Sequence, residues 1–239
     1  MKQEIPKGYS IQKIKRWGDF LNHQRKSAVV ESFRLTDRTF TQIDHYLGSL
    51  PSQMIEYLIG RNGGKIRIGD IAGGRKSLCA KEMAEKYKGR VTVANIDLLH
   101  NPDRFRLPNL IQIAGDVTDL PLQTKSLDFA LCYQLFPGLE DDGNYTKGVA
   151  AVAEIARTLK EGGVALINED YLCRRCFFSQ DKTIKNLAAE ANIFMSRRQG
   201  NNSRPGEMVT GGHSSFLMIE KRPQDFNLLR IRERIIGHI

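Results

Sequence analysis

The sequence predicts an α/β protein built on a doubly wound, mostly parallel β-sheet. From residue 60 to residue 221, short apolar runs typical of buried strands alternate with longer segments whose apolar residues recur at helical spacing. Three of the strand-like runs carry an aspartate at their end, and glycines follow the first of them. Such alternation is typical of parallel strands joined by covering helices.

The expected strands are short, mostly apolar runs bounded by turn-forming or charged residues. In chain order they cover residues 66–71, 91–96, 109–114, 127–133, 164–167, 192–196 and 215–220. The last two flank a polar segment, residues 197–212, rich in turn-forming residues. This segment suits either a mobile lid or an ordinary connection, and an ordinary connection is favoured.

Helices are expected between these strands and before the first of them. They cover residues 51–59, 77–88, 144–159 and 179–191. Gly162 and Gly163 are expected to end the third of these helices as a C-cap pair. Near the N-terminus, helical spacing predicts an amphipathic helix that contains Ile11, Ile14, Trp17, Phe20 and Leu21.

The length of 239 residues suits one domain with extensions better than two full domains. We expect a helical N-terminal extension over residues 1–50, the α/β domain over residues 51–222 and a basic tail over residues 223–239. No apolar signal region opens the chain, and nowhere do eighteen consecutive residues stay apolar. A cytoplasmic protein without a membrane span is therefore expected, and its four cysteines are expected to be reduced thiols.

The formal net charge of +9 is unevenly distributed. Residues 1–40 hold nine Lys and Arg against four Asp and Glu, and residues 171–239 hold twelve against six. The flanks therefore carry +5 and +6, and the centre carries −2. This pattern favours either a solvated basic surface, which is the commoner case, or contact between the basic flanks and a polyanion such as nucleic acid.

The aspartates at the strand ends are candidate ligand contacts. Asp70, Asp97 and Asp116 follow or close successive strands, and ligands of open α/β sheets bind at the carboxyl ends of strands. The spacing of twenty-seven residues between Asp70 and Asp97 is close to that of an acid that binds ribose hydroxyls. Gly73 and Gly74 would let the backbone approach such a ligand. A bound nucleoside is therefore predicted.

Two other nucleotide-binding motifs fit this stretch poorly. In a phosphate-binding Walker A loop, glycine stands directly before Lys-Ser/Thr, whereas here Arg75 separates Gly74 from Lys76 and Ser77. The dinucleotide fingerprint G-x-G-x-x-G occurs in no register of this stretch. A nicotinamide-dependent oxidoreductase therefore stays open but weakly supported.

Four segments in order resemble the class I S-adenosylmethionine-dependent methyltransferases. Asp70-Ile71-Ala72-Gly73-Gly74 is similar to the glycine-rich first motif, Asp97 to the ribose-binding acid, Gly115-Asp116-Val117 to the adenine-binding segment, and Leu159-Lys160-Glu161-Gly162-Gly163 to the motif before the fifth strand. The resemblance covers roughly residues 60–170 and continues more loosely to residue 221. It implies a Rossmann-like, seven-stranded sheet and S-adenosyl-L-methionine as the cofactor.

The resemblance also implies which residues bind the cofactor. These are Asp70, Ala72, Gly73, Gly74, Asp97, Leu98, Asp116, Val117, Cys132 and Tyr133. It carries over no single catalytic residue, because methyl transfer needs little beyond alignment of the acceptor and, where necessary, a base. No metal is expected: Cys173 and Cys176 form a lone CxxC pair, and His213 is expected to be a surface residue.

Two departures from the family pattern bear on activity. Ala72 replaces a glycine, and Lys76 introduces a cation near the expected position of the cofactor's carboxylate. Lys76 either pairs with that carboxylate or points to solvent, and solvent is favoured narrowly. The segment from Cys132 to Pro137 lacks the Asn/Asp-Pro-Pro-aromatic motif linked to methylation of base or amide nitrogens.

These observations support two functional hypotheses. The first is an S-adenosylmethionine-dependent methyltransferase that acts on an unidentified acceptor, either a small molecule or nucleic acid, for which the basic flanks favour an anionic group. The second is a catalytically weak or inactive module of the same fold that binds the cofactor or nucleic acid. The sequence predicts neither the atom methylated nor the oligomeric state.

Overall fold

The structure, a computed structural model, describes residues 38–74, 76–98, 106–133, 146–168, 191–199 and 213–221. These residues belong to one compact unit, residues 38–239, which is separate from residues 1–37. The predicted helix around residues 11–21, nearly all of the helix at 179–191 and the basic tail lie outside the described residues. The N-terminal extension and the predicted domain boundaries therefore stay predictions.

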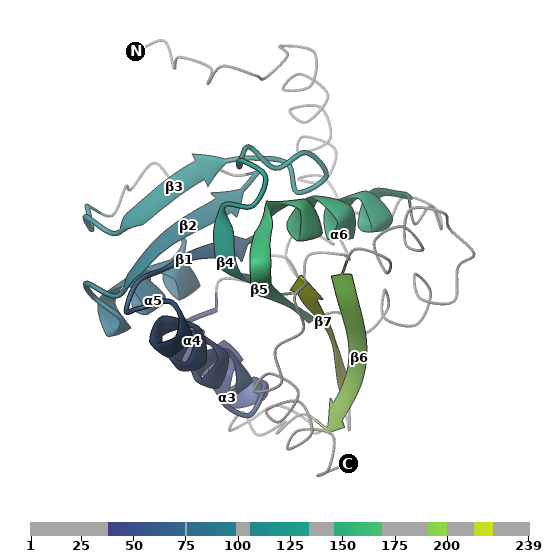
Figure 1. Cartoon of the computed structure of the whole chain (residues 1–239), viewed down its shortest axis with the longest axis horizontal. Helices are drawn as coiled ribbons and strands as arrows, with labels where there is room; N and C mark the ends of the chain where they lie inside the picture. The colour runs from purple at the N-terminus through teal and green to yellow at the C-terminus, as the bar shows by residue number, and fades with distance from the viewer. Residues whose placement is uncertain are drawn as a thin grey trace, which may run out of the picture. The chain divides into compact units, whose positions relative to one another are not determined.

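The core of this unit is a single mixed sheet with the order β3-β2-β1-β4-β5-β7-β6 (Figure 1). Neighbours from β3 to β5 run parallel, whereas β7 is antiparallel to both β5 and β6. The strands are β1 Ile66–Ile71, β2 Val91–Asp97, β3 Leu110–Ala114, β4 Leu127–Tyr133, β5 Leu159–Asn168, β6 Ala191–Gln199 and β7 His213–Lys221. The predicted Rossmann-like α/β fold with a mostly parallel sheet is confirmed.

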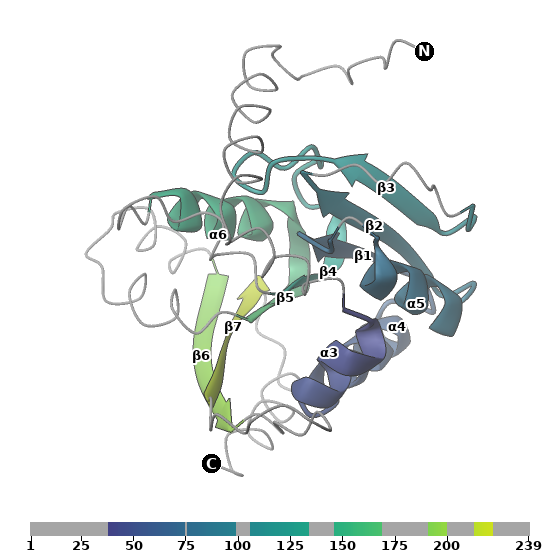
Figure 2. The same cartoon turned by 180° about the vertical axis from the view of Figure 1, so that it is seen from behind.

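Helices cover both faces of the sheet, as Figures 1 and 2 show from opposite sides. The described helices are α3 Phe40–Tyr46, α4 Leu50–Arg61, α5 Leu78–Lys86 and α6 Thr146–Thr158. Residues of α3, α4 and α5 share one buried cluster with one face of the sheet, and residues of α6 share a second cluster with the other face. Alternation along a strand assigns side chains to these faces: Leu131 and Tyr133 join the first cluster, and Cys132 joins the second.

The glycine pair before the fifth strand does not cap a helix, which corrects the prediction. Helix α6 ends at Thr158, and β5 begins at Leu159, which already pairs with Leu127. The register then shifts so that Phe129 pairs with Val164, and Gly162 takes a positive φ of 72° inside this irregularity. The pair therefore forms a bulge that an apolar pattern alone does not distinguish from a helix end.

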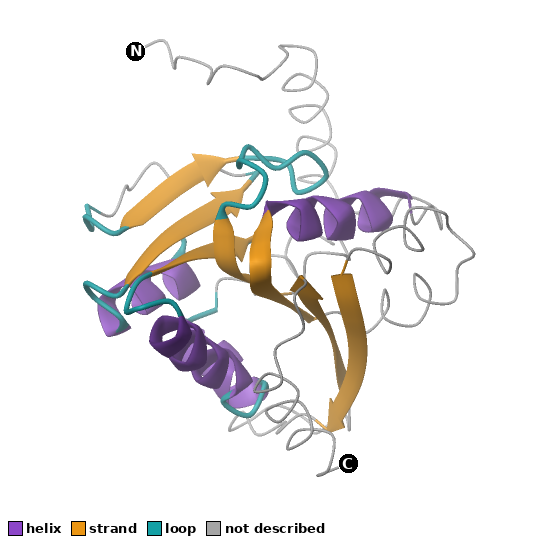
Figure 3. Ribbon diagram, in the orientation of Figure 1, coloured by secondary structure: helices purple, strands orange, loops and turns teal. Residues whose placement is uncertain are grey.

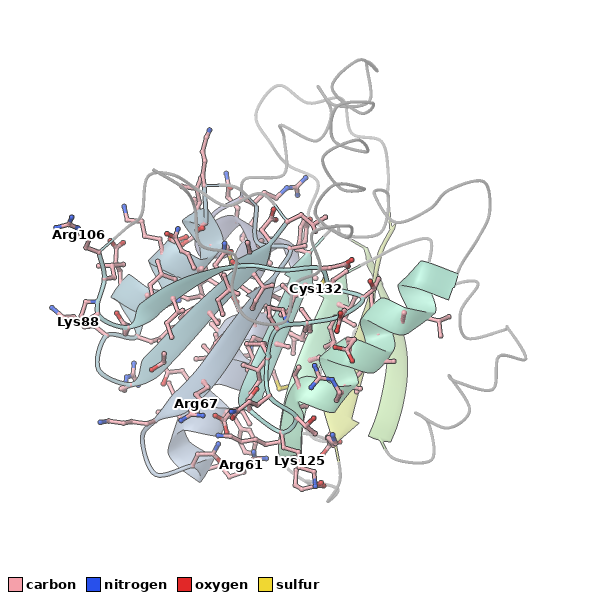
Figure 4. All side chains as sticks on the ribbon, turned by 90° about the horizontal axis from the view of Figure 1, so that it is seen from above. Arg61, Arg67, Lys88, Arg106, Lys125 and Cys132 are labelled. Carbon is pink, nitrogen blue, oxygen red and sulfur yellow. The ribbon has the colours of Figure 1, made fainter. Side chains whose placement is uncertain are left out.

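The buried Asp128 connects the amino ends of β1 and β4 through hydrogen bonds. Both carboxylate oxygens of Asp128 accept from Lys160 Nζ at 2.8 Å, and the carboxylate also accepts from the Arg67 amide at 2.7 Å and from Asn62 Nδ2 at 2.9 Å. Figure 4 shows Arg67 with Arg61 and Lys125 at this end and Cys132 toward the other. These cations therefore lie at the amino ends of β1 and β4, away from the edge formed by the carboxyl ends of the strands.

The described loops lie at the ends of the strands and helices, as the teal segments in Figure 3 show. Strand β6 extends to Gln199 and so includes the first residues of the predicted polar loop.

None of the helices within the described ranges has the length and apolar character that crossing a bilayer requires.

Candidate functional site

The turn between β1 and α5 lies where the strand order reverses, between β1 and β4. Ala72 and Gly74 take positive φ angles of 57° and 80°. The Ala72 amide donates to the Ile96 carbonyl at 2.7 Å, and the Gly74 amide donates to Asp97 Oδ2 at 3.0 Å. The turn therefore folds against the end of β2, and Ala72 adopts a backbone conformation that glycine would take at no steric cost.

Gly73 lies directly over two buried oxygens. A Cβ at this position would lie 2.2 Å from Asn95 Oδ1 and 2.3 Å from Asp70 Oδ2. Both oxygens are buried, and neither has a hydrogen-bond partner within the described part of the chain. The close approach explains why this position needs glycine, and it leaves two unsatisfied acceptors beneath the turn.

Asp70 connects β1 to the start of α5. Burial, with a smaller contribution from the charge of Asp97, raises the pKa of Asp70 to about 7, although hydrogen bonds from the Ala80 amide and the Cys79 thiol act in the opposite direction. Ser77 makes no capping bond with its side chain, so Asp70 supplies the acceptor at the beginning of this helix. Burial also raises the pKa of the Cys79 thiol, and the neighbouring Asp70 adds to that effect.

Three polar residues that sequence reasoning missed support this turn. Ser77 Oγ accepts from Asn95 Nδ2 at 2.8 Å and from Gln112 Nε2 at 2.9 Å. The start of α5 is thereby joined to β2 and β3. The available signal was Asn95, which shares the period-2 positions of the apolar residues Val91 and Val93 in the run VTVANID.

The ends of β2 and β3 bring Asp97 and Asp116 to the same edge. The Gly115 amide donates to the Asp97 carbonyl at 3.0 Å, which connects the two strand ends. Asp116 Oδ1 accepts from the Thr118 amide at 2.9 Å and from its hydroxyl at 2.8 Å, so this acid also shapes its own turn. Leu98 is partly buried, and Val117 is buried.

The end of β4 places its two candidate residues on opposite faces. Cys132 is fully buried on the α6 side, whereas Tyr133 faces the α3 and α5 side. Arg38 Nη1 donates to the Tyr133 hydroxyl at 2.8 Å, and Arg38 Cζ lies 4.8 Å from the centroid of the ring. The sequence carried no signal for Arg38, because it lies 95 residues from Tyr133.

The remaining candidates contribute less to this edge. The side chain of Lys76 is exposed. Cys173 and Cys176 lie outside the described residues, and His213 begins β7 with its side chain undescribed. Within the described ranges, no group of three or more histidine, cysteine or acidic side chains could hold a metal ion.

The strand order arranges these groups in a row. Asp116, Asp97, the glycine turn and Tyr133 follow the sequence β3, β2, β1, β4 along one edge of the sheet. Such a row suits an extended ligand with a polar group at each strand end. The carboxylates accept hydrogen bonds, as a diol or an amino group requires, and the turn offers backbone without a side chain. The residues present therefore fit a nucleoside with an extended substituent.

Residues 70–167 match a protein-family model described as a methyltransferase domain. Among solved structures, a Burkholderia thailandensis 1,6-didemethyltoxoflavin-N1-methyltransferase with bound S-adenosylhomocysteine is similar at 15% identity and a TM-score of 0.50, over 92% of this chain and 94% of that one. The N-methyltransferase NodS from Bradyrhizobium japonicum aligns at 14% identity and a TM-score of 0.46, over 77% of this chain and 97% of the other. Comparison with curated proteins finds no match.

Proposed function

We propose that the chain is a class I S-adenosylmethionine-dependent methyltransferase and that it transfers the methyl group of this cofactor to an acceptor at the end of β4. The match of residues 70–167 to a methyltransferase-domain model supports this proposal. The observation that supports this function is the row of acids and glycine turn along one sheet edge. The β1–α5 turn and the ends of β2 and β3 are joined there by hydrogen bonds from backbone amides to backbone carbonyls and to the Asp97 carboxylate. A rigid row of this kind can position an extended ligand before it reacts.

Within this proposal, Asp97 binds the ribose hydroxyls and Asp116 binds the adenine amino group. The turn formed by Ala72, Gly73 and Gly74 lies beside the amino-acid end, with Asp70 beneath it. When bound, the cofactor supplies an activated methyl group. The described residues then have to orient the acceptor and exclude water, and Cys132 and Tyr133 border that region.

Replacing Asp97 is expected to weaken binding of S-adenosylhomocysteine. In Asp97→Ala, the loss of an ionised partner for the ribose should cost about 1.5 to 3 kcal/mol of binding free energy. Asp97 also accepts from the Gly74 amide, so a looser turn adds to this loss. Isothermal titration calorimetry measures the affinity of wild type and variant.

Asp119→Ala is the matched control, because it removes an exposed acid three positions after Asp116. This control is expected to bind as wild type does. The proposal is wrong if folded wild type gives no heat with S-adenosylhomocysteine, or if Asp97→Ala binds it with undiminished affinity.

A second candidate function is cofactor binding without methyl transfer. One observation favours it: Cys132 is fully buried, and the Tyr133 hydroxyl already accepts from Arg38, so neither side chain is a ready general base. Transfer of a labelled methyl group from S-adenosylmethionine to a cell extract, lost in Asp97→Ala, would exclude this candidate. Cofactor binding without any such transfer would support it.

We also propose that the methyl acceptor is anionic or that the protein binds a polyanion, because both flanks of the chain are basic. Residues 1–40 and 171–239 carry net charges of +5 and +6, whereas the residues between them carry −2. Binding of a polyanion through these flanks should weaken as salt concentration rises. Salt-independent binding would contradict the electrostatic explanation.

A further inference from the structure

Arg38 has a buried Nε–H group without an acceptor among the described residues. Its side chain is partly buried, and Nη1 is held by the Tyr133 hydroxyl at 2.8 Å. Nε is buried and has no hydrogen-bond partner within the described part of the chain. A guanidinium has five donors in a fixed planar arrangement, and leaving one of them buried without an acceptor costs free energy. The arrangement therefore calls for an anionic or polar acceptor.

The position of Arg38 follows from the strand to which it is tied. Tyr133 closes β4 on the same face as Leu131, and Leu131 pairs with Asp70 of β1. Asp70 in turn contacts the start of α5. Because Arg38 is bonded to Tyr133, it lies at the carboxyl end of β4, on the face of the sheet that α3 and α5 cover.

The expected course of the cofactor leads to the same place. If adenine lies at Asp116 on β3 and ribose at Asp97 on β2, the rest of the molecule extends along the edge toward β1 and β4. That part of S-adenosylmethionine is an amino acid, with an ammonium and a carboxylate. A carboxylate is the group for which a partly desolvated guanidinium is best suited.

We propose that Arg38 binds the carboxylate of the cofactor's amino-acid end through Nε, with Tyr133 as the residue that positions the guanidinium. This inference rests on the proposed function and assigns a binding residue that precedes the first strand by many positions. Lys76 is the alternative cation near the turn, but its side chain is exposed, and exposed ion pairs contribute little. The ring and hydroxyl of Tyr133 hold Arg38 in one orientation, which reduces the entropy lost on binding.

The test compares two ligands that differ only in the carboxylate. Isothermal titration calorimetry would measure the affinities of S-adenosylmethionine and of decarboxylated S-adenosylmethionine, which keeps the ammonium. For Arg38→Gln, affinity for S-adenosylmethionine should fall about ten- to a hundredfold, and affinity for the decarboxylated ligand should change less than about twofold. Wild type should prefer the ligand with the carboxylate, and Arg38→Gln should lose that preference.

Two further variants keep the result interpretable. Arg38→Lys retains the charge without the planar donors and should bind S-adenosylmethionine with intermediate affinity. Lys76→Gln removes a nearby exposed charge and should bind both ligands as wild type does. Retained binding of the decarboxylated ligand also reports that a variant is folded.

The outcomes separate this inference from the proposed function. If wild type binds both ligands and Arg38→Gln weakens both equally or neither, Arg38 does not bind the carboxylate. In that case the buried Nε–H group of Arg38 donates to a different partner, either an anionic group of the methyl acceptor or another segment of the chain. If wild type binds neither ligand, the proposed function itself is wrong, and this inference is overturned with it.

Discussion

At pH 8, Asp70→Asn is expected to raise the free energy of unfolding by about 3 kcal/mol. Burial raises the pKa of Asp70 from its ordinary value of 3.8 to about 7. This difference corresponds to about 4 kcal/mol of destabilisation once the carboxylate is ionised. The expected gain in the free energy of unfolding is smaller than this destabilisation for two reasons. The asparagine amide must also be buried, and it accepts more weakly than a carboxylate from Ala80 and Cys79.

The sign of the pH dependence follows from the raised pKa. Below pH 3.8, Asp70 is protonated in both the folded and the unfolded state and causes no loss of stability. As pH rises from 3.8 to about 7, the unfolded state releases its proton first, so the folded state becomes relatively less stable. Above about pH 7 the loss is complete and constant. The advantage of Asp70→Asn should therefore be clearly smaller at pH 5 than at pH 8.

Urea unfolding of wild type and Asp70→Asn at pH 5 and pH 8 measures this difference. Asp119→Asn removes a negative charge at an exposed position and controls for net charge. A stability difference that is the same at both pH values would contradict the role assigned to burial. Calorimetry with S-adenosylhomocysteine on the same variant separates two roles of Asp70: lost affinity supports contact with the cofactor, and unchanged affinity supports a purely structural cap of α5.

Gly73→Ala is expected to lower the free energy of unfolding by about 2 to 4 kcal/mol and to weaken binding of S-adenosylhomocysteine at least tenfold. The added Cβ would lie within 2.5 Å of three atoms of Asp70 and Asn95. Both side chains are buried, and Asn95 is tied to Ser77, so they cannot move aside at low cost. The turn must open instead, which displaces the backbone expected beside the cofactor.

Gly60→Ala provides the matched control for this substitution. Gly60 lies in α4, and a Cβ there would meet no atom within 4 Å. This variant should be more stable than wild type by about 0.5 to 1 kcal/mol, because alanine favours the helix. Urea unfolding and calorimetry measure both variants. A Gly73→Ala protein as stable as wild type would show that the turn accommodates a side chain.

Local pattern was sufficient for the strands that are buried on both faces. The runs at residues 66–71 and 127–133 match β1 and β4, because a strand covered by helices on both sides needs a continuous apolar segment. The same local information misassigned Gly162 and Gly163. A glycine pair suits both a helix end and a bulge, and only the pairing of Leu159 with Leu127 distinguishes them.

The candidate site likewise contains residues that the sequence predicts and residues that only the structure reveals. The acids at strand ends could be recognised because parallel strands bring their carboxyl ends to one edge whatever the details of packing. Ser77, Asn95 and Gln112 were missed because their importance lies in hydrogen bonds to one another across three elements. No spacing rule connects such residues before the sheet is assembled.

The sequence by itself determined that strands and helices alternate and that Asp70, Asp97 and Asp116 lie at the ends of successive strands, since both depend on periodicity and position along the chain. Only the tertiary structure decided that Asp70 is buried with a pKa of about 7 and that Arg38 lies against Tyr133. Burial and long-range hydrogen bonds depend on which surfaces meet in the folded chain. Arg38 and Tyr133 are 95 residues apart, and they come into contact only when the segment that begins α3 packs against β4.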